Sequence, residues 1–208
     1  MTKSFHSTSF ANLVPVPEDS PGGIAFPRSH ADLERVPMDP LAVTSRKQRV
    51  MTIQSKGPTN AWNFYPDDIE YKQVVKQRGL LFLADHIPHL GMKRSLIRNA
   101  GVKLGNSVSI DMNVLFTPVF THYIEIEDEA ILGAGCLIAS HQYGVNNYEI
   151  GRVRVGRQAL VGAMSVVAPG VVIGEGAALG PGSVATRDIP PYEFWAGVPA
   201  RRVADHRP

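Results

Sequence analysis

The chain has 208 residues and a net charge of +2, which suits one packed domain with an appendage and implies no polyanionic partner such as nucleic acid. Cys136 is the single cysteine, so an intrachain disulfide and a cysteine-ligated zinc site are excluded. The N-terminus lacks the apolar core of a secretory signal, and no apolar run approaches the roughly 18 residues of a membrane-spanning helix. We therefore expect a cytoplasmic protein without a membrane span.

Residues 1–65 are expected to form a proline-rich arm. Six prolines fall within the first 40 residues, and proline fixes φ and removes a hydrogen-bond donor, which disfavours long helices and central strands. A short strand is expected between Val43 and Gln54. The arm is expected either to wrap a partner subunit or to stay mobile.

Residues 66–100 are predicted to be helical. Pro66, followed by two aspartates, is typical of a helix start, and Pro88 divides the segment into two parts. The basic residues of its second part lie close in sequence to the apolar run Leu80–Leu83, which would suit a membrane surface. The favoured interpretation is a helix packed on the domain with a solvated basic face, formed by Lys93, Arg94 and Arg98.

From Leu104 onward, aliphatic or aromatic residues recur at every sixth position. The in-phase sets are Leu104, Ile110 and Phe116; Ile126, Leu132 and Ile138; and Val155, Val161, Val167, Ile173 and Leu179. A period of six suits one short strand and one corner, so three units complete a triangular turn of a solenoid. We predict a mainly β fold, a parallel β-helix over residues 101–189, followed by a C-terminal tail over 190–208.

The phase of the repeat breaks twice. The spacing between Phe116 and Ile126, and between Ile138 and Val155, is not a multiple of six. Segments must leave the coils at both places. The second break is the larger, and we expect a loop there over about residues 144–154.

Two segments of the repeat region resemble a known family. One is IGEGAALGPGSVATRDIPPYEFWAGVPARRV, from Ile173 to Val203, and the other is ILGAGCLIASHQYG, from Ile131 to Gly144. Both are similar to segments of the hexapeptide-repeat acyltransferases, in particular the maltose, galactoside and polysaccharide O-acetyltransferases. The resemblance covers residues 91–204, and it implies a left-handed parallel β-helix and a homotrimer. It also implies transfer of an acyl group, expected to be acetyl, from acetyl-CoA to a hydroxyl of a carbohydrate or small-molecule acceptor.

His141 is the expected catalytic residue. It follows the in-phase Ile138 by three residues, at the start of the larger phase break, and the catalytic histidine of the family holds the same place. A neutral imidazole can remove the proton of a hydroxyl as its oxygen attacks a thioester. The resemblance therefore implies direct transfer with His141 as general base. Cys136 falls at an inward position and is expected in the core rather than as a nucleophile.

The resemblance also implies the residues that hold the donor, in a groove between two subunits. The matching positions are Ala163, Pro181, Thr186, Arg187 and Arg201. The Ala163 N–H is expected to stabilise the oxyanion, whereas Pro181 departs from the small residue that similar enzymes carry there. The two arginines can pair with phosphate oxygens, or they are only exposed side chains.

Acceptor binding is less well defined by the sequence. Asn113 matches an asparagine that contacts the acceptor in the sugar acetyltransferases, but residues 114–123 otherwise differ from those enzymes. His122, at the first phase break, either lines the acceptor pocket or is only a loop residue. The sequence therefore does not name the acceptor.

Two other functions are compatible with the same repeat. A γ-class carbonic anhydrase would need three histidines on zinc, and the repeat region offers only His122 and His141. A non-catalytic trimeric scaffold would keep the β-helix without turnover, but His141 and the ending GVPARRV argue against it. We expect an enzyme that needs no metal.

Overall fold

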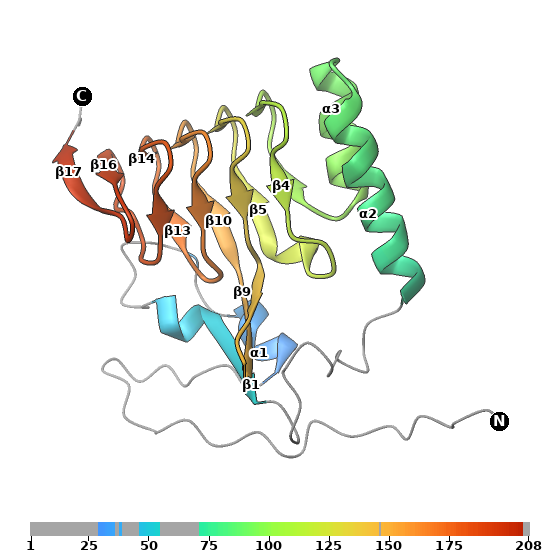
Figure 1. Ribbon diagram of the computed structural model, residues 1–208, viewed down its shortest axis with the longest axis horizontal. Coiled ribbons are helices and arrows are strands. Elements are labelled where there is room, and N and C mark those ends of the chain that lie inside the picture. Colours follow the sequence, from blue (N-terminus) through green and yellow to red (C-terminus); the bar gives the residue numbers. More distant parts are fainter. Residues whose placement is uncertain (1–28, 36–37, 39–45, 55–70, 146, 206–208) are drawn as a thin grey trace.

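A computed structural model describes residues 29–35, 38, 46–54, 71–145 and 147–205, and its main body is a parallel β-helix (Figure 1). Each coil contributes one short strand to each of three faces. Face 1 consists of β2 (Lys103–Leu104), β5 (Ile124–Ile126), β10 (Val153–Val155) and β13 (Val172–Ile173). Face 2 consists of β3 (Ser109–Ile110), β6 (Ile131–Leu132), β11 (Leu160–Val161), β14 (Ala178–Leu179), β16 (Glu193–Ala196) and β17 (Arg201–Asp205). Face 3 consists of β4 (Leu115–Phe116), β7 (Leu137–Ile138), β12 (Val166–Val167) and β15 (Val184–Ala185).

The six-residue repeat forms the core of this body. Equivalent residues of successive coils pair in register, so that Leu132 lies between Ile110 and Val161 on face 2. All three are at most 4% exposed. The predicted inward positions are therefore buried, except that Leu104 of the first coil is only partly buried. Cys136 lies in the same core, and burial raises the pKa of its thiol to about 12, which suits a core residue and not a nucleophile.

Three edges run along the β-helix where the faces meet, and we name them edge 1–2, edge 2–3 and edge 3–1 after those faces. Edges 1–2 and 2–3 are made of tight corners. The chain makes its long excursions at edge 3–1, where the first holds η3 (Thr121–Tyr123) and the second holds β8 (His141–Tyr143) and β9 (Asn147–Gly151).

The second excursion is a β-hairpin, which corrects the expectation of a loop over residues 144–154. Strands β8 and β9 are antiparallel, and β9 and then β10 occupy most of that range. The hairpin is stable because its alternating residues Tyr148 and Ile150 are buried on one side. Only the tip around Gly144 and Val145 remains as a turn.

The described part of the N-terminal segment packs on the β-helix of its own chain. It consists of α1 (His30–Arg35), η1 (Arg46–Arg49) and β1 (Val50–Gln54), and β1 pairs antiparallel with β9. Arg46 Nε donates to Pro169 O (2.7 Å), and the fully buried Arg49 donates to Gly170 O (3.1 Å) and forms an ion pair with Asp188. These described residues of the expected arm therefore pack on edge 3–1 of their own chain, which offers both hydrogen-bond acceptors and a strand partner. Residues 1–28 and 55–65 lie outside the described range.

The two ends of the β-helix are closed differently. Helices α2 (Tyr71–His86) and α3 (Leu90–Asn99) cover the first coil, and the hairpin of β16 and β17 extends face 2 at the other end (Figure 1). The expected C-terminal tail is therefore largely a strand pair. No helix in the described ranges has the length and apolar character needed to cross a bilayer.

We expect Gly170→Ala to destabilise the protein more than Gly182→Ala. Both glycines have positive φ (+78° and +64°), which costs alanine about 1–2 kcal/mol. A Cβ at Gly182 meets open space, whereas one at Gly170 collides with Val50 Cγ2 and lies 3.1 Å from Arg46 O. Overpacking should therefore add about 1–3 kcal/mol to the loss in the free energy of unfolding, measured with urea. Equal losses in the two variants would show that the N-terminal segment does not pack on edge 3–1.

Candidate active site

The hairpin that carries His141 leaves the coils at a base that hydrogen bonds hold in place. Ala139 still donates its N–H to Val167 O (3.0 Å), so the coil continues to this residue. The buried Ser140 then accepts from Gly151 N (2.8 Å) and bonds through its own N–H and Oγ to Thr117 Oγ1 (2.8 and 2.9 Å). These bonds close the base of the hairpin and fix the position of the residue that follows, His141.

His141 lies on the apolar side of a three-stranded antiparallel sheet. In the order β1–β9–β8, His141 is opposite Ile150 and Tyr143 is opposite Tyr148, whereas Gln142 is opposite Glu149. Alternate residues of a strand share a face. The side chain of His141 therefore shares the face of Tyr143, Tyr148 and Ile150, and Gln142 bonds to Glu149 on the opposite face (2.7 Å).

Aromatic rings surround His141 on this face. Its ring lies edge-to-face with Phe120 (centroids 5.6 Å apart, 77°) and with Tyr143 (5.5 Å, 83°). The ring of His122 lies 6.3 Å from the same Phe120, so the first and second excursions bring the two histidines to one aromatic residue. His122 itself is exposed. The structure thus places both predicted histidines at edge 3–1.

The environment of His141 keeps its imidazole neutral. Burial lowers its pKa from 6.5 to about 4, because the charged form loses hydration among apolar rings. The Nδ1 atom is buried and has no hydrogen-bond partner within the described residues, while the side chain as a whole is partly exposed. At pH 7 the ring therefore carries an available lone pair, as a general base requires.

A second row of predicted residues lies on another edge. Asn113, Ala163 and Pro181 occupy corners of edge 2–3 in the first, third and fourth coils, and hydrogen bonds of 2.8–3.0 Å join the corners of successive coils. Asn113 has φ +55°, and its N–H donates to Asp85 Oδ1 of α2 (2.7 Å). Face 3 separates this edge from His141 within one chain, so a single chain does not bring these residues to the imidazole.

The remaining predicted donor residues lie at the two ends of β15. Thr186 and Arg187 follow β15 at edge 3–1, two coils beyond the coil of His141, and Arg187 is exposed. Arg201 begins β17 and is exposed, and the N–H of Ala200 before it donates to Val184 O (2.8 Å). Arg201 therefore lies at edge 2–3 of the last coils, on the side of Pro181, whereas Thr186 and Arg187 lie at the other end of β15.

Sequence reasoning missed Phe120 and Tyr143, the rings that contact His141. Both lie in the excursions, where the six-residue phase gives no information on which way a side chain points. The two phase breaks located the segments, but a ring contact between them depends on how the excursions fold back.

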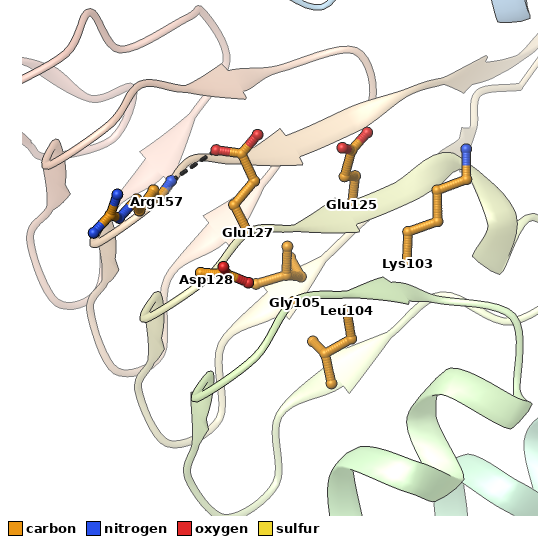
Figure 2. Close-up of a pocket in the computed structure, with 8 residues that line it drawn as sticks. Lys103, Leu104, Gly105, Glu125, Glu127, Asp128 and Arg157 are labelled. Atoms are coloured by element: carbon orange, nitrogen blue, oxygen red, sulfur yellow. Dashed lines mark hydrogen bonds between the residues drawn. The ribbon is translucent and has the colours of Figure 1, made fainter.

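A surface hollow of ≈490 Å³ lies elsewhere, at face 1 and edge 1–2, and Figure 2 shows its lining side chains projecting from neighbouring coils. Two of its three carboxylates are held by the fold. Glu127 accepts from Arg154 Nε (2.7 Å) and Arg157 N (2.9 Å), and Asp128 accepts from Asn106 N (2.7 Å). The hollow is therefore not part of the candidate site.

No group of three His, Cys, Asp or Glu side chains in the described ranges is arranged to hold a metal ion.

Comparison with known proteins agrees with the repeat. The model of the family "Bacterial transferase hexapeptide (six repeats)" matches residues 152–187. The "Putative acetyltransferase YvoF" of Bacillus subtilis (strain 168) is 31% identical over 146 residues, which are 70% of this chain and 84% of that protein.

Solved structures share the fold. A hexapeptide-repeat acetyltransferase from Vibrio cholerae complexed with acetyl coenzyme A has a TM-score of 0.58 at 16% identity and covers 70% of this chain and 93% of its own. A galactoside acetyltransferase in complex with coenzyme A has a TM-score of 0.56 at 20% identity, with 68% and 85% covered. The prediction of a left-handed parallel β-helix is confirmed.

The fold and the aligned repeats define a left-handed β-helix transferase. The chain belongs to the hexapeptide-repeat acyltransferase family, and it is an acyltransferase.

We expect Phe120→Leu to raise the pKa of His141 from about 4 toward 6.5, because the smaller side chain admits water to the imidazole. NMR titration of the His141 ring measures this pKa. The wild-type free energy of unfolding should fall as pH drops from 6.5 to about 4, since the unfolded chain then binds a proton that the folded chain does not. This slope should be shallower in Phe120→Leu.

The matched control is Phe194→Leu, on β16 at the far end of face 2. It should leave the His141 titration unchanged. A His141 pKa that is the same in Phe120→Leu and wild type would contradict a role for the Phe120 ring in burying the imidazole.

Proposed function

We propose that the protein is an acetyl-CoA-dependent O-acyltransferase with His141 as general base. The observation that carries this proposal is the neutral, partly exposed imidazole at the base of the hairpin, held between two aromatic rings. The relatives' names support the reaction class, since one is a galactoside acetyltransferase in complex with coenzyme A. Use of an acyl-CoA also favours a cytoplasmic location.

The proposed reaction is a direct transfer. The buried Nδ1 leaves Nε2 as the nitrogen that faces the acceptor. Nε2 takes the proton of the acceptor hydroxyl while its oxygen bonds to the thioester carbonyl carbon. The C–S bond then breaks, and the imidazolium returns the proton to the sulfur of CoA. An acyl-enzyme is not needed, and the buried Cys136 is poorly suited to form one.

The oxyanion of this reaction needs a hydrogen-bond donor. The Ala163 N–H donates no hydrogen bond to another described residue, unlike the neighbouring Gly162 and Met164, which both bond between coils. A backbone N–H that is fixed but unused can stabilise a developing oxyanion. We assign this role to Ala163.

For the donor, we propose that CoA lies along face 3 toward its last coil. Arg187 and Arg201 are exposed there and can pair with its phosphates, with Thr186 beside Arg187. Ala163 and Pro181 would contact the pantetheine from edge 2–3. This arrangement requires both edges of face 3, which in one chain face different directions.

A homotrimer would bring these edges together. The outward residues of face 1 include Lys103, Glu125 and Arg154, whereas, apart from Ser109 of the first coil, those of the other two faces are mainly apolar. They are Ile131 and Leu160 on face 2 and Leu115, Leu137, Val166 and Val184 on face 3. Apolar surface of this extent marks an interface. We propose that edge 2–3 of one copy meets edge 3–1 of the next, so that Asn113 and Ala163 face the partner's His141.

The proposed acceptor is a sugar or small molecule with a free hydroxyl. Asn113 would contact it from one copy and His122 from the other. The γ-class carbonic anhydrase alternative is disfavoured, because residues 101–205 contain only His122 and His141 as histidines and three are needed.

We expect His141→Ala to lower kcat by about 10²–10⁴, because the general base is lost. Thiol release from acetyl-CoA measures turnover, and circular dichroism checks the fold. The control His86→Ala removes an exposed histidine on α2 and should keep wild-type turnover. Near wild-type turnover in His141→Ala would refute the assignment.

We expect Ala163→Pro to lower kcat by about 10²–10³, since it deletes the proposed oxyanion donor. Proline is compatible with this corner, because Pro181 occupies the equivalent position one coil later. Ala134→Pro changes the corner of the previous coil and is the matched control, expected to retain turnover.

Mixing the two inactive variants tests whether the site is shared. If His141 and Ala163 act across an interface, refolded mixtures of His141→Ala and Ala163→Pro should regain part of the lost activity. A mixture no more active than its components, together with a monomer in light scattering, would contradict the shared site.

A further inference from the structure

Helices α2 and α3 form a cap over the first coil, and the inner face of this cap packs against the β-helix. On its inner side α2 buries Gln77 and Ala84. The Gln77 side chain accepts from Val119 N (3.0 Å) and donates to Thr121 Oγ1 (3.0 Å), on either side of Phe120, the residue that contacts His141. The inner face is therefore bonded to the first excursion and is fixed relative to the candidate site.

Two of the basic residues expected on a solvated face of α3 instead hold this helix to the coils. Lys93 is buried and donates to Asp111 O (2.5 Å). Arg98 donates to Leu104 O (2.9 Å) and Gly105 O (2.6 Å). The expectation of a solvated basic face is thus wrong for Lys93, which is buried against the first coil, whereas Arg98 stays exposed while it bonds to two carbonyls of that coil.

The outer face of α2 carries large apolar side chains in solvent. Tyr71, Val75 and Phe82 are 79%, 53% and 65% exposed, and Leu83 is 52% exposed. At 100° per residue, Tyr71, Val75 and Phe82 fall within one narrow stripe along the helix. A stripe of this kind on a helix with a fixed inner face marks a contact surface.

Basic side chains border this stripe. Lys72 and Lys76 lie on one side and Arg78 on the other, and all three are exposed. The only carboxylate of residues 71–99 is Asp85, which accepts from Asn113 N, so the acid is used within the fold. The same range holds six Lys and Arg residues, whereas the whole chain has a net charge of only +2. Positive charge is therefore concentrated on the cap.

We propose that the outer face of α2 docks on an anionic lipid bilayer. The exposed apolar stripe can enter the acyl boundary while the bases beside it meet phosphate headgroups. The same face of a second copy is a poor partner, because like charges would oppose each other. Docking would place the first coils at the membrane, with His141 in the second coil from the cap. The proposal does not depend on the catalytic role of His141.

Vesicle co-sedimentation of the full chain tests the proposal. We expect binding to vesicles of phosphatidylglycerol and phosphatidylcholine, weakened by salt, and little binding to phosphatidylcholine alone. Replacing Lys72, Lys76 and Arg78 by Gln should weaken binding roughly 100-fold, since each base near an anionic surface contributes about a factor of five. Phe82→Ser should also weaken it.

Matched controls separate this face from general charge and apolarity. Replacing the exposed Lys47, Lys103 and Arg157 by Gln removes equal charge elsewhere, and Val203→Ser removes an exposed apolar side chain at the opposite end; both should bind as wild type. Absence of binding, equal binding to neutral vesicles, or equal loss in the control triple would overturn the proposal. A change of oligomeric state in Phe82→Ser, with vesicle binding unchanged, would overturn it in favour of a contact between copies.

Discussion

Stacking of side chains inside the β-helix is the constraint on which the other features depend. Each inward residue, such as Leu132, must meet its equivalent in the coils before and after it, so the strands cannot slip by one residue without exposing the core. The same stacking fixes the three edges as straight rows. A residue placed at a corner is therefore aligned with residues about 18–30 positions away in the neighbouring coils, and sites can be built along an edge from distant parts of the sequence.

Both excursions leave at the same edge, and this makes a second, separate core possible. Leu33, Met51, Phe120, Tyr148 and Ile150 pack together outside the coils, drawn from the N-terminal segment and both excursions. The inner stack is not interrupted, because Ser140 and Gly151 close the base of the hairpin with a hydrogen bond. His141 lies beside this second core, which explains how one imidazole in a largely polar edge loses enough hydration to stay neutral.

The sequence predicted the inner stack well because the constraint there is local and periodic. Ile138 and Leu179 could be assigned to the core from spacing alone, and the phase breaks placed His141 at the start of an excursion. The hairpin, the ring contact with Phe120 and the pairing of β1 with β9 could not be predicted in this way, since they join segments with no common period. The corner positions of Asn113 and Ala163 were accessible from the repeat, but their separation from His141 by a whole face needed the three-dimensional structure.

The pairing of β1 with β9 also bears on how the chain reaches this structure. Val50 pairs with Gly151, so about 100 residues separate the two strands, whereas the contacts between coils join residues about 18–30 apart. Closing the long loop is entropically more expensive and is rewarded only after the coils have ordered the hairpin. During synthesis β1 is made early and must wait for its partner. Strand β1, which completes the three-stranded sheet that carries His141, is then the last strand to join this sheet and the first to leave it. The N-terminal segment can therefore open by local unfolding while the coils stay intact.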